Sequence, residues 1–587
     1  MIRIAELKLP LGVIGFDPEN HTEFHPTDAL RALAAQLLGI APEAIAQLQV
    51  HKRSFDARKA QLQAVYIADI TLADASAEAA LLAQFAQHPH VNPTPDMAWK
   101  PVAQAPADLA ERPVVVGFGP CGIFAALVLA QMGFKPIVLE RGKEVRERTK
   151  DTWGLWRKRV LTPESNVQFG EGGAGTFSDG KLYSQIKDPR HLGRKVMDEF
   201  VAHGAPHDIL YAAHPHIGTF KLVKVVEGMR EEIIRLGGEI RFEQRVTDVQ
   251  IAGDGEARQL TGLTVLNLAT GDSYQLPTHH AVLALGHSAR DTFAMLYERG
   301  VSMEAKPFSI GFRIEHPQSV IDRARWGRHA GHPLLGAADY KLVHHAHNGR
   351  AVYSFCMCPG GTVVAATSEP ERVVTNGMSQ YSRAERNANA GMVCAVDPSD
   401  FPHDAAAFAW AFDGKTYGVE NLAEGEFHPL AGIVLQRQLE SRAYTLGGSN
   451  YSAPGQLVGD FIAGKPSTVF GEVQPSYKPG VALGDLHQAL PAYAIAAMRE
   501  ALPAFGKKIR GYDMHDAILT GVETRTSSPL KMGRDASLQS LNTRGIYPAG
   551  EGASYAGGIL SAGVDGIKVG ESVALQITER LGQAQSA

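Results

Sequence analysis

Apolar residues recur along the first hundred positions with two different periods. Alternation of apolar and polar residues predicts strands, and recurrence every three or four residues predicts helices. The predicted elements are strands over residues 2–9, 48–55 and 62–72 and helices over residues 27–38 and 77–87. A segment with four prolines between positions 93 and 106 then interrupts the pattern. The order strand, helix, strand, strand, helix predicts a ferredoxin-like α+β domain over residues 1–105.

Beyond the proline-rich segment, continuous apolar runs replace the alternation. Residues 114–116 form one run and residues 136–139 a second, and the stretch 123–133 between them has small and apolar residues in helical order. A strand, a turn and a helix that lead to another strand are the unit of a Rossmann-like parallel sheet. We expect this sheet to use residues 106–302 and, since a strand followed by a helix recurs near the C-terminus, residues 514–587.

The turn after the first run has the sequence Gly-Phe-Gly-Pro-Cys-Gly at residues 117–122. In such a turn Gly117 permits the tight bend, Gly119 lets the backbone approach a pyrophosphate, and Gly122 lets the helix pack closely on the strand. Glu140 ends the second run, at the distance where an acid accepts hydrogen bonds from an adenosine ribose. The helix N-terminus adds N–H donors and positive potential. This unit predicts a dinucleotide site.

Two further glycine-rich segments indicate a long ligand. Residues 169–181 contain five glycines and end on Lys181, so they offer backbone donors and a cation to phosphates. Residues 543–558 form a short strand that runs into a glycine turn around Glu551, and helical spacing continues over residues 559–581. The C-terminal segment thus predicts a further strand and helix beside the same ligand.

The residues between the two parts of the Rossmann-like unit predict an inserted substrate domain over residues 303–513. Its predicted elements are strands over residues 307–314, 341–345, 351–357 and 362–366 and a helix over residues 486–502. A mostly antiparallel sheet is the economical arrangement, because such a layer can cover a ligand and bury a substrate against it. The predicted fold class is therefore α/β, with this insertion and the N-terminal α+β domain.

These motifs, together with Ala284-Leu285-Gly286 at a strand end, resemble the three FAD-contacting segments of the two-dinucleotide-fold, glutathione-reductase-like flavoproteins. The resemblance implies FAD as the cofactor, with Val246 assigned by analogy to the backbone that meets the adenine. The implied cofactor-binding residues are Gly117, Gly119, Pro120, Cys121, Gly122, Glu140, Arg141, Gly172, Gly173, Thr176, Asp179, Lys181, Val246, Gly286, Gly550, Glu551, Gly558 and Ile559.

Within that superfamily the chain is most similar to a group of largely uncharacterised NAD(P)/FAD-dependent oxidoreductases, the FAD-dependent dehydrogenases. The segments that carry this similarity are residues 52–58, 172–181, 356–361, 523–528 and 556–559. More distantly, the glycine-rich segment is similar to that of flavoprotein reductases that saturate activated double bonds. The resemblance indicates a fold and a cofactor; a substrate has to be argued from the site itself.

The chemistry of a bound flavin suggests roles for several residues. Its reduced ring carries negative charge that a helix N-terminus stabilises, and residues 557–559 are placed for that. Glu551 is expected to bind ribityl or phosphate-side groups, or else only caps its turn. Lys181 is expected to contact the pyrophosphate or lie near N5, in preference to a plain surface position. His216 and His287 are candidate proton donors, with no basis for choosing between them.

Arg525 is the strongest candidate for recognition of a substrate carboxylate or phosphate. A guanidinium binds such groups through two hydrogen bonds, and hydroxyl residues flank this one. An ion pair between domains is the alternative role. Arg525 and Lys181 are therefore the predicted catalytic residues.

Cys356 and Cys358 lie two apart in an apparent strand, so both side chains are expected on one face. A flavin-coupled thiol pair would make the protein a disulfide reductase, but those enzymes usually carry Cys-x-x-Cys or a wider pair, and a Cys-x-Cys bridge is strained. Buried small side chains are the preferred interpretation. The four cysteines predict no disulfide framework. The histidine clusters at residues 214–216 and 344–347 lack an acid or cysteine at ligand spacing, so no metal site is predicted.

Composition favours small-molecule partners. With 587 residues, 44% of them apolar, the chain can form three or four domains. A formal net charge of −5 gives no general reason to bind nucleic acid or an anionic membrane. The charged, alternating start lacks the apolar region of a signal peptide, and no apolar run approaches the roughly 20 residues that span a bilayer. We therefore expect a cytoplasmic protein; its oligomeric state is not predicted.

The sequence thus predicts an FAD-dependent oxidoreductase, a dehydrogenase or ene-type reductase, that moves a hydride between flavin and a small organic substrate. NAD(P)H is a candidate transient electron donor, although no second complete nucleotide fingerprint marks a domain for it. One alternative is an FAD-dependent monooxygenase. The other is a flavoprotein that binds RNA or a protein through its N-terminal domain. Its basic residues are Lys52, Arg53, Arg58 and Lys59, for which a strand edge or domain interface is the simpler account.

Overall fold

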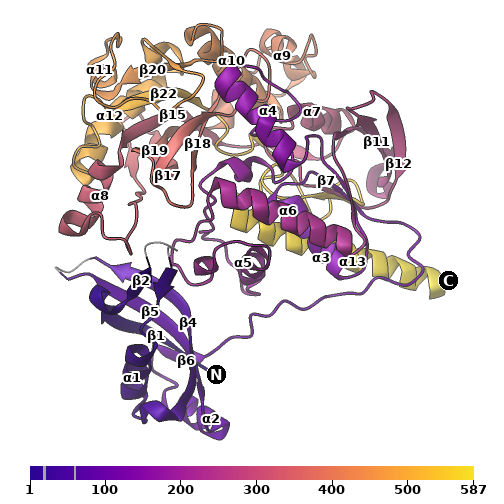
Figure 1. Cartoon of the computed structure of the whole chain (residues 1–587). Helices are drawn as coiled ribbons and strands as arrows, with labels where there is room; N and C mark the ends of the chain where they lie inside the picture. The colour runs from indigo at the N-terminus through magenta and orange to yellow at the C-terminus, as the bar shows by residue number, and fades with distance from the viewer. Residues whose placement is uncertain (18–21, 58–60, 587) are drawn as a thin grey trace.

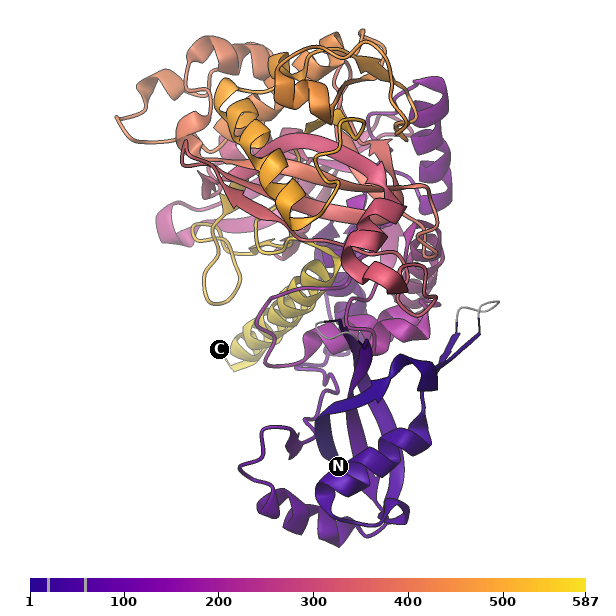
Figure 2. The ribbon, with the colours of Figure 1, turned by 90° about the vertical axis from the view of Figure 1, so that its left-hand side faces the viewer.

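A computed structural model describes residues 1–17, 22–57 and 61–586 and gives the chain a mixed α/β fold (Figure 1). A small N-terminal unit is set apart from a larger body, and an extended segment connects the two (Figures 1 and 2). None of the helices that the structure describes combines the length and the apolar character needed to cross a bilayer.

The N-terminal unit is an antiparallel sheet with two helices. Its sheet has the order β4-β5-β1-β6, and the predicted strands and helices all occur, each within about three residues of its expected ends. The three-residue strand β6 and the hairpin β2–β3 were not predicted, because so few residues carry no readable period. The elements are β1 (Ile2–Pro10), β2 (Gly15–Asp17), β3 (Thr22–Phe24), α1 (Thr27–Leu38), β4 (Ile45–Asp56), β5 (Gln63–Leu72), α2 (Ala75–Gln84) and β6 (Val91–Pro93).

Strand β4 attaches this unit to the larger body through backbone hydrogen bonds. The Arg53 N–H donates to the Tyr211 carbonyl (2.7 Å), and the Ala213 N–H donates to the Arg53 carbonyl (3.0 Å). The Arg53 side chain is buried and paired with Glu23. Arg53 is therefore an interface residue and not part of an exposed basic patch. Of the other three residues in that hypothesis, Arg58 and Lys59 lie outside the described residues.

A five-stranded parallel sheet forms the centre of the larger body, in the order β24-β13-β7-β8-β9. Helices α3, α6 and α13 lie side by side along it (Figure 1), and α3 is buried on all sides because nearly every residue in it is small or apolar. An antiparallel sheet of β10, β11 and β12 follows β9. The elements are β7 (Val114–Val116), α3 (Pro120–Gln131), β8 (Ile137–Leu139), α4 (Val145–Lys158), α5 (Leu192–Ala202), α6 (Thr219–Arg235), β9 (Glu239–Arg241), β10 (Gln244–Ala252), β11 (Gln259–Asn267), β12 (Ser273–Pro277), β13 (Ala281–Leu283), α7 (Arg290–Glu298), β24 (Ile546–Pro548) and α13 (Ile559–Ser586).

The inserted chain forms an eight-stranded, mostly antiparallel sheet in the order β16-β17-β19-β15-β22-β20-β21, with β18 beside β17. Helices α8, α10, α11 and α12 surround it (Figure 1). The elements are β14 (Met303–Ala305), β15 (Phe308–Pro317), α8 (Gln318–Trp326), β16 (Val343–His345), β17 (Ala351–Ala365), β18 (Thr375–Ser379), β19 (Asn387–Val396), α9 (Ala405–Ala411), α10 (Ala431–Leu446), β20 (Ala453–Leu457), α11 (Val458–Ala463), β21 (Val481–Leu483), α12 (Ala492–Lys508), β22 (Ile518–Glu523) and β23 (Leu530–Met532).

Three expectations for the insertion need correction. The boundary at residue 513 is wrong, because β22 lies beyond it and pairs with β15 and β20 inside the inserted sheet. The strands expected over 351–357 and 362–366 are one bulged strand, β17. The predicted helix over 486–502 is a short 3-10 turn followed by α12, since the chain changes direction at Pro491.

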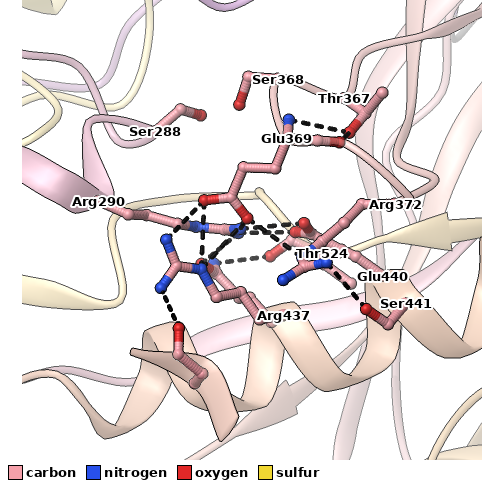
Figure 3. A network of polar contacts seen from close by, with 12 residues as sticks. Ser288, Arg290, Thr367, Ser368, Glu369, Arg372, Arg437, Glu440, Ser441 and Thr524 are labelled. Carbon is pink, nitrogen blue, oxygen red and sulfur yellow. Dashed lines mark hydrogen bonds and ion pairs between the residues drawn. The ribbon is translucent and has the colours of Figure 1, made fainter. Parts of the chain in front are cut away.

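A largely buried cluster of opposite charges joins the insertion to the parallel sheet (Figure 3). Glu440 of α10 accepts hydrogen bonds from Arg290, the first residue of α7, at 2.7 and 3.0 Å, and from Arg525, just after β22, at 2.9 and 3.0 Å. Glu369 pairs with Arg290 and Arg437. Burial alone would raise the pKa of Glu440, but the two guanidinium groups outweigh it and lower that pKa to about 2.

We expect the substitution Glu440→Gln to lower the free energy of unfolding by about 3 to 5 kcal/mol, because it leaves the buried Arg525 without its anion and Arg290 with Glu369 alone. Denaturant unfolding at pH 7 measures this. The control Glu298→Gln removes the exposed ion pair with Lys415 and should cost less than about 1 kcal/mol. Because the native pKa is depressed from 4.5 to about 2, the gap between wild type and Glu440→Gln should narrow as the pH falls through this window. Equal costs for the two variants at pH 7 would contradict the assigned role.

Candidate functional site

A cavity of about 360 Å³ opens where the strands of the parallel sheet end. Its walls come from the residues that follow β7, β8, β13 and β24, and the inserted strands β17, β18 and β22 supply the facing wall. Ligands of open parallel sheets bind at the carboxyl ends of the strands. Segments more than 400 residues apart in the sequence therefore meet around one site.

Most of the residues expected at the cofactor lie on this cavity. Gly122, Gly172 and Thr176 do not line it; Gly122 instead packs the turn, and Thr176 is buried beside Gly172. The predicted residues that do line it are Gly117, Gly119, Pro120, Cys121, Glu140, Arg141, Gly173, Asp179, Lys181, Val246, Gly286, Gly550, Glu551, Gly558, Ile559 and Arg525.

The glycines of the first turn and Gly558 differ in whether the fold itself leaves room for a side chain. A Cβ on Gly117 would lie 2.2 Å from the Ala284 carbonyl oxygen, and one on Gly122 would lie 1.9 Å from the Gly117 oxygen, so the fold itself excludes a side chain at both. A Cβ on Gly119 would meet nothing nearer than 3.5 Å, and one on Gly558 nothing within 4 Å. At these two positions bare backbone faces open cavity, which leaves room for a ligand to approach it.

Two helix N-termini lie at the cavity. Helix α3 begins at Pro120 after the N-cap Gly119, and α13 begins at Ile559 after Gly558. All four residues line the cavity. A helix N-terminus attracts negative charge through its unpaired N–H groups and its dipole. The cavity therefore has two separate places for anionic parts of one ligand.

Glu140 organises the loops around the cavity. Its Oε1 accepts hydrogen bonds from the N–H groups of Gly142 (2.8 Å) and Gly170 (3.0 Å), and its Oε2 accepts one from the Phe118 N–H (2.9 Å). The carboxylate thus joins the first glycine turn to the second glycine-rich segment. One lone pair on Oε2 remains for the ribose hydroxyl that the sequence predicted there.

Asp179 and Lys181 form a charged cluster with the insertion. Asp179 is buried and paired with Arg383 at 2.6 Å, and the Lys181 ammonium lies 3.7 Å from the same carboxylate. Burial raises the pKa of Asp179, but the two cations outweigh it and lower that pKa overall. Asp179 therefore fastens the glycine-rich segment to the insertion, and Lys181 supplies the cation at this part of the cavity wall.

Arg525 forms an ion pair with Glu440 of the insertion, as in the alternative role expected for it. Besides Glu440, its guanidinium donates to the hydroxyls of Ser288 (3.1 Å) and Ser368 (2.7 Å). Four of its five N–H groups are thus used within the protein. The group fastens the loop after β13 to the insertion, and it has little capacity left for a substrate carboxylate.

Two titratable groups on the cavity wall favour their neutral forms. Burial and the positive charges of Arg525 and Arg290 lower the pKa of His287 to about 3. Burial raises the pKa of Glu551 to about 7, and Cys356 adds to this. At neutral pH His287 is an uncharged imidazole and cannot act as an acid in its cationic form, whereas Glu551 can carry a proton. The other candidate, His216, bonds to the Tyr381 carbonyl and is not a lining residue.

The sequence missed the contribution of the inserted strands. Phe355 and Cys356 of β17, Asn376 of β18 and Glu523 of β22 all line the cavity. The segment Cys-Met-Cys-Pro-Gly-Gly could have indicated that β17 is irregular at the cavity, but a regular strand was expected there. Over the described part of the chain, no group of three or more His, Cys, Asp or Glu side chains is arranged to hold a metal ion.

Two family models match the chain. Residues 307–526 match a family described as FAD-dependent protein, C-terminal domain-like, a range that contains the inserted sheet through β22. Residues 1–71 match a domain of unknown function, DUF8436. The first match supports FAD as the cofactor.

Two solved structures illustrate how low the structural similarity is. A flavocytochrome c3 fumarate reductase is 11% identical, with 82% of each chain covered and a TM-score of 0.31. The 3-ketosteroid-Δ4-(5α)-dehydrogenase of Rhodococcus jostii RHA1 is 12% identical, with 80% of this chain and 99% of that chain covered and a TM-score of 0.31. Similarity this low says nothing about the reaction.

An uncharacterized protein of Clostridium beijerinckii is similar over nearly the whole length. It is 45% identical over 565 residues, which cover 94% of this chain and 98% of the relative. The chain therefore belongs to the same family as this clostridial protein, and its residues 307–526 match the family described as FAD-dependent protein, C-terminal domain-like.

Proposed function

We propose that the cavity binds FAD and that the protein is an oxidoreductase that transfers a hydride between the flavin and a small organic substrate. The observation that carries the proposal is the cradle of bare glycine backbone and two helix N-termini at the ends of the parallel strands. When bound, FAD supplies two-electron hydride chemistry that no side chain offers.

The lining residues fit the successive parts of this cofactor. Gly119 and the N-terminus of α3 suit the pyrophosphate, and Glu140 suits the adenosine ribose. The N-terminus of α13 at Ile559 suits the part of the flavin that gains negative charge on reduction. Glu551, which can hold a proton at neutral pH, suits the region between the two.

The inserted sheet would bind the substrate. It supplies the cavity wall that faces the cofactor cradle, and this wall carries the aromatic ring of Phe355, the amide of Asn376 and the carboxyl of Glu523. Burial raises the pKa of Glu523 despite its pairing with Arg313. This combination of apolar and hydrogen-bonding groups suits a small organic molecule with at least one polar substituent.

We also propose a division of the chain into an N-terminal ferredoxin-like domain, an FAD domain in two parts and a substrate domain that ends near residue 526. The antiparallel order β4-β5-β1-β6, the parallel five-stranded sheet and the separate inserted sheet support it. The buried pairing of Arg53 with Glu23 favours an interface role for the N-terminal domain over RNA binding.

The first test is the visible spectrum of the purified protein, followed by anaerobic titration with NADH and then NADPH. We expect flavin absorption near about 450 nm. Bleaching by one nucleotide would make the protein a nicotinamide-fed reductase. Bound flavin that neither nucleotide bleaches would make it a dehydrogenase supplied with electrons by its own substrate. A colourless protein that takes up no added FAD would overturn the proposal.

Substitutions of the glycines in the first turn distinguish an effect on FAD binding from an effect on folding. Gly119→Val should abolish FAD retention but leave the thermal midpoint of the FAD-free protein near that of the FAD-free wild type, because a Cβ at this position meets no protein atom nearer than 3.5 Å. Gly122→Ala should lower the midpoint by several degrees, since its Cβ would lie 1.9 Å from a carbonyl oxygen. The control Gly12→Ala, with nothing within 4 Å, should change neither quantity. A Gly119→Val protein with a full complement of FAD would refute the placement of the pyrophosphate.

A further inference from the structure

Two thiols lie at the wall that the insertion contributes to the cavity. Cys356 of β17 lines the cavity and is partly exposed, whereas Cys358 is fully buried behind it. The Cys358 thiol donates a hydrogen bond to the Cys356 carbonyl oxygen, with the sulfur 3.4 Å from that oxygen. The two cysteines are therefore in direct contact, and Cys356 is the one that reaches the cavity.

The strand is distorted where the thiols occur. The pairing of β17 with β19 shifts register between Phe355 and Cys358 and again before Gly361, and Cys356 has a φ of +43°. In a regular strand, residues two apart have Cα atoms about 6.6 Å from each other, near the upper limit for a disulfide. A left-handed residue without glycine's freedom costs conformational energy, and such residues cluster at functional sites. Here Cys356, at the bulge, reaches the cavity, whereas Cys358 stays buried.

The surroundings make the two thiols unequal. The interaction with the Cys358 thiol, together with the positive charges of Arg313 and Lys181, outweighs burial and lowers the pKa of Cys356 to about 5. The interaction with Cys356 and burial raise the pKa of Cys358. Arg313 is itself fixed by Glu523 and donates to the Cys356 carbonyl at 2.9 Å. An accessible thiolate beside a buried, protonated thiol is the arrangement that thiol–disulfide exchange requires.

We propose that Cys356 and Cys358 are a redox-active dithiol at the flavin cavity, and that the substrates of the enzyme include small disulfides. This inference rests on the proposed FAD-dependent function and names a substrate class for the same site. It differs from the interpretation of these cysteines as inert buried side chains.

The proposed reaction balances as follows. The Cys356 thiolate attacks a disulfide R–S–S–R, the S–S bond breaks, and one thiol leaves while the other half stays bound to Cys356. Cys358 loses its proton and displaces the second thiol, which forms the Cys356–Cys358 disulfide. Two electrons from the reduced flavin, replenished by a reduced nicotinamide or another hydride donor, and two protons from solvent then restore the dithiol. The sum is one disulfide reduced to two thiols.

The other two cysteines provide internal controls. Cys394 is fully buried in β19, burial raises its pKa to about 11, and it does not line the cavity. Burial also raises the pKa of Cys121. The substitution Cys394→Ser is therefore the matched control for Cys356→Ser and Cys358→Ser.

The test is an anaerobic titration of the oxidised full-length holoprotein with dithionite. Wild type and Cys394→Ser should take up four electrons per FAD, two for the flavin and two for the disulfide. Cys356→Ser and Cys358→Ser should each take up only two electrons per FAD. Independently, mass spectrometry of the oxidised wild type should show that the peptide containing residues 356–358 has lost two hydrogens and resists alkylation until it is reduced.

If the wild type takes up only two electrons and both thiols of that peptide are alkylated after oxidation, the proposed dithiol is wrong. The proposed FAD-dependent function is not contradicted by that result. A protein without flavin would overturn the function instead, and the mass of the oxidised peptide would still decide whether the two thiols pair. The mass measurement needs no variant, so poor folding of a serine mutant would not obscure the result.

Discussion

The inserted sheet can form one wall of the cavity because a buried cluster of opposite charges holds it against the parallel sheet. Glu440 sits between Arg290, at the start of the helix after β13, and Arg525, at the end of β22. Each charge would be costly in this interior without its partners, so the cluster tolerates few alternative arrangements. It thereby fixes the cavity loop that contains Ser288, to which Arg525 also donates. The site depends on this contact between two parts of the chain.

Burial also sets the protonation states around the cavity. His287 becomes neutral because cations surround a desolvated imidazole, and Glu551 becomes able to hold a proton because few groups stabilise its anion. Cys356 shifts the other way, because Cys358 and Arg313 stabilise its thiolate. The cavity wall thus carries a carboxyl group that keeps its proton to a higher pH than usual and a thiol that loses its proton at a lower pH than usual.

Several elements were predictable from local pattern. The helix of residues 27–38 occurs as expected, and the glycine turn at residues 117–122 lies between a strand and a helix, because tight turns and close backbone packing allow few residue types. Residues 518–523, which form β22, were assigned to the second part of the Rossmann-like unit, since six residues do not reveal which sheet they join. The bulge at Cys356 was also missed, because the register of a distorted strand depends on its neighbour.

The sequence by itself determined the local framework of the site, because a glycine turn between a strand and a helix and an acid at the end of the second strand are local patterns. Only the tertiary structure decided what faces that site. Whether Arg525 binds a substrate or a carboxylate of its own chain depends on Glu440, which lies 85 residues away in sequence. Whether Cys356 is an inert core residue or a cavity thiol depends on how β17 pairs with β19. Charge pairing and strand register are long-range properties, and no spacing along the chain encodes them.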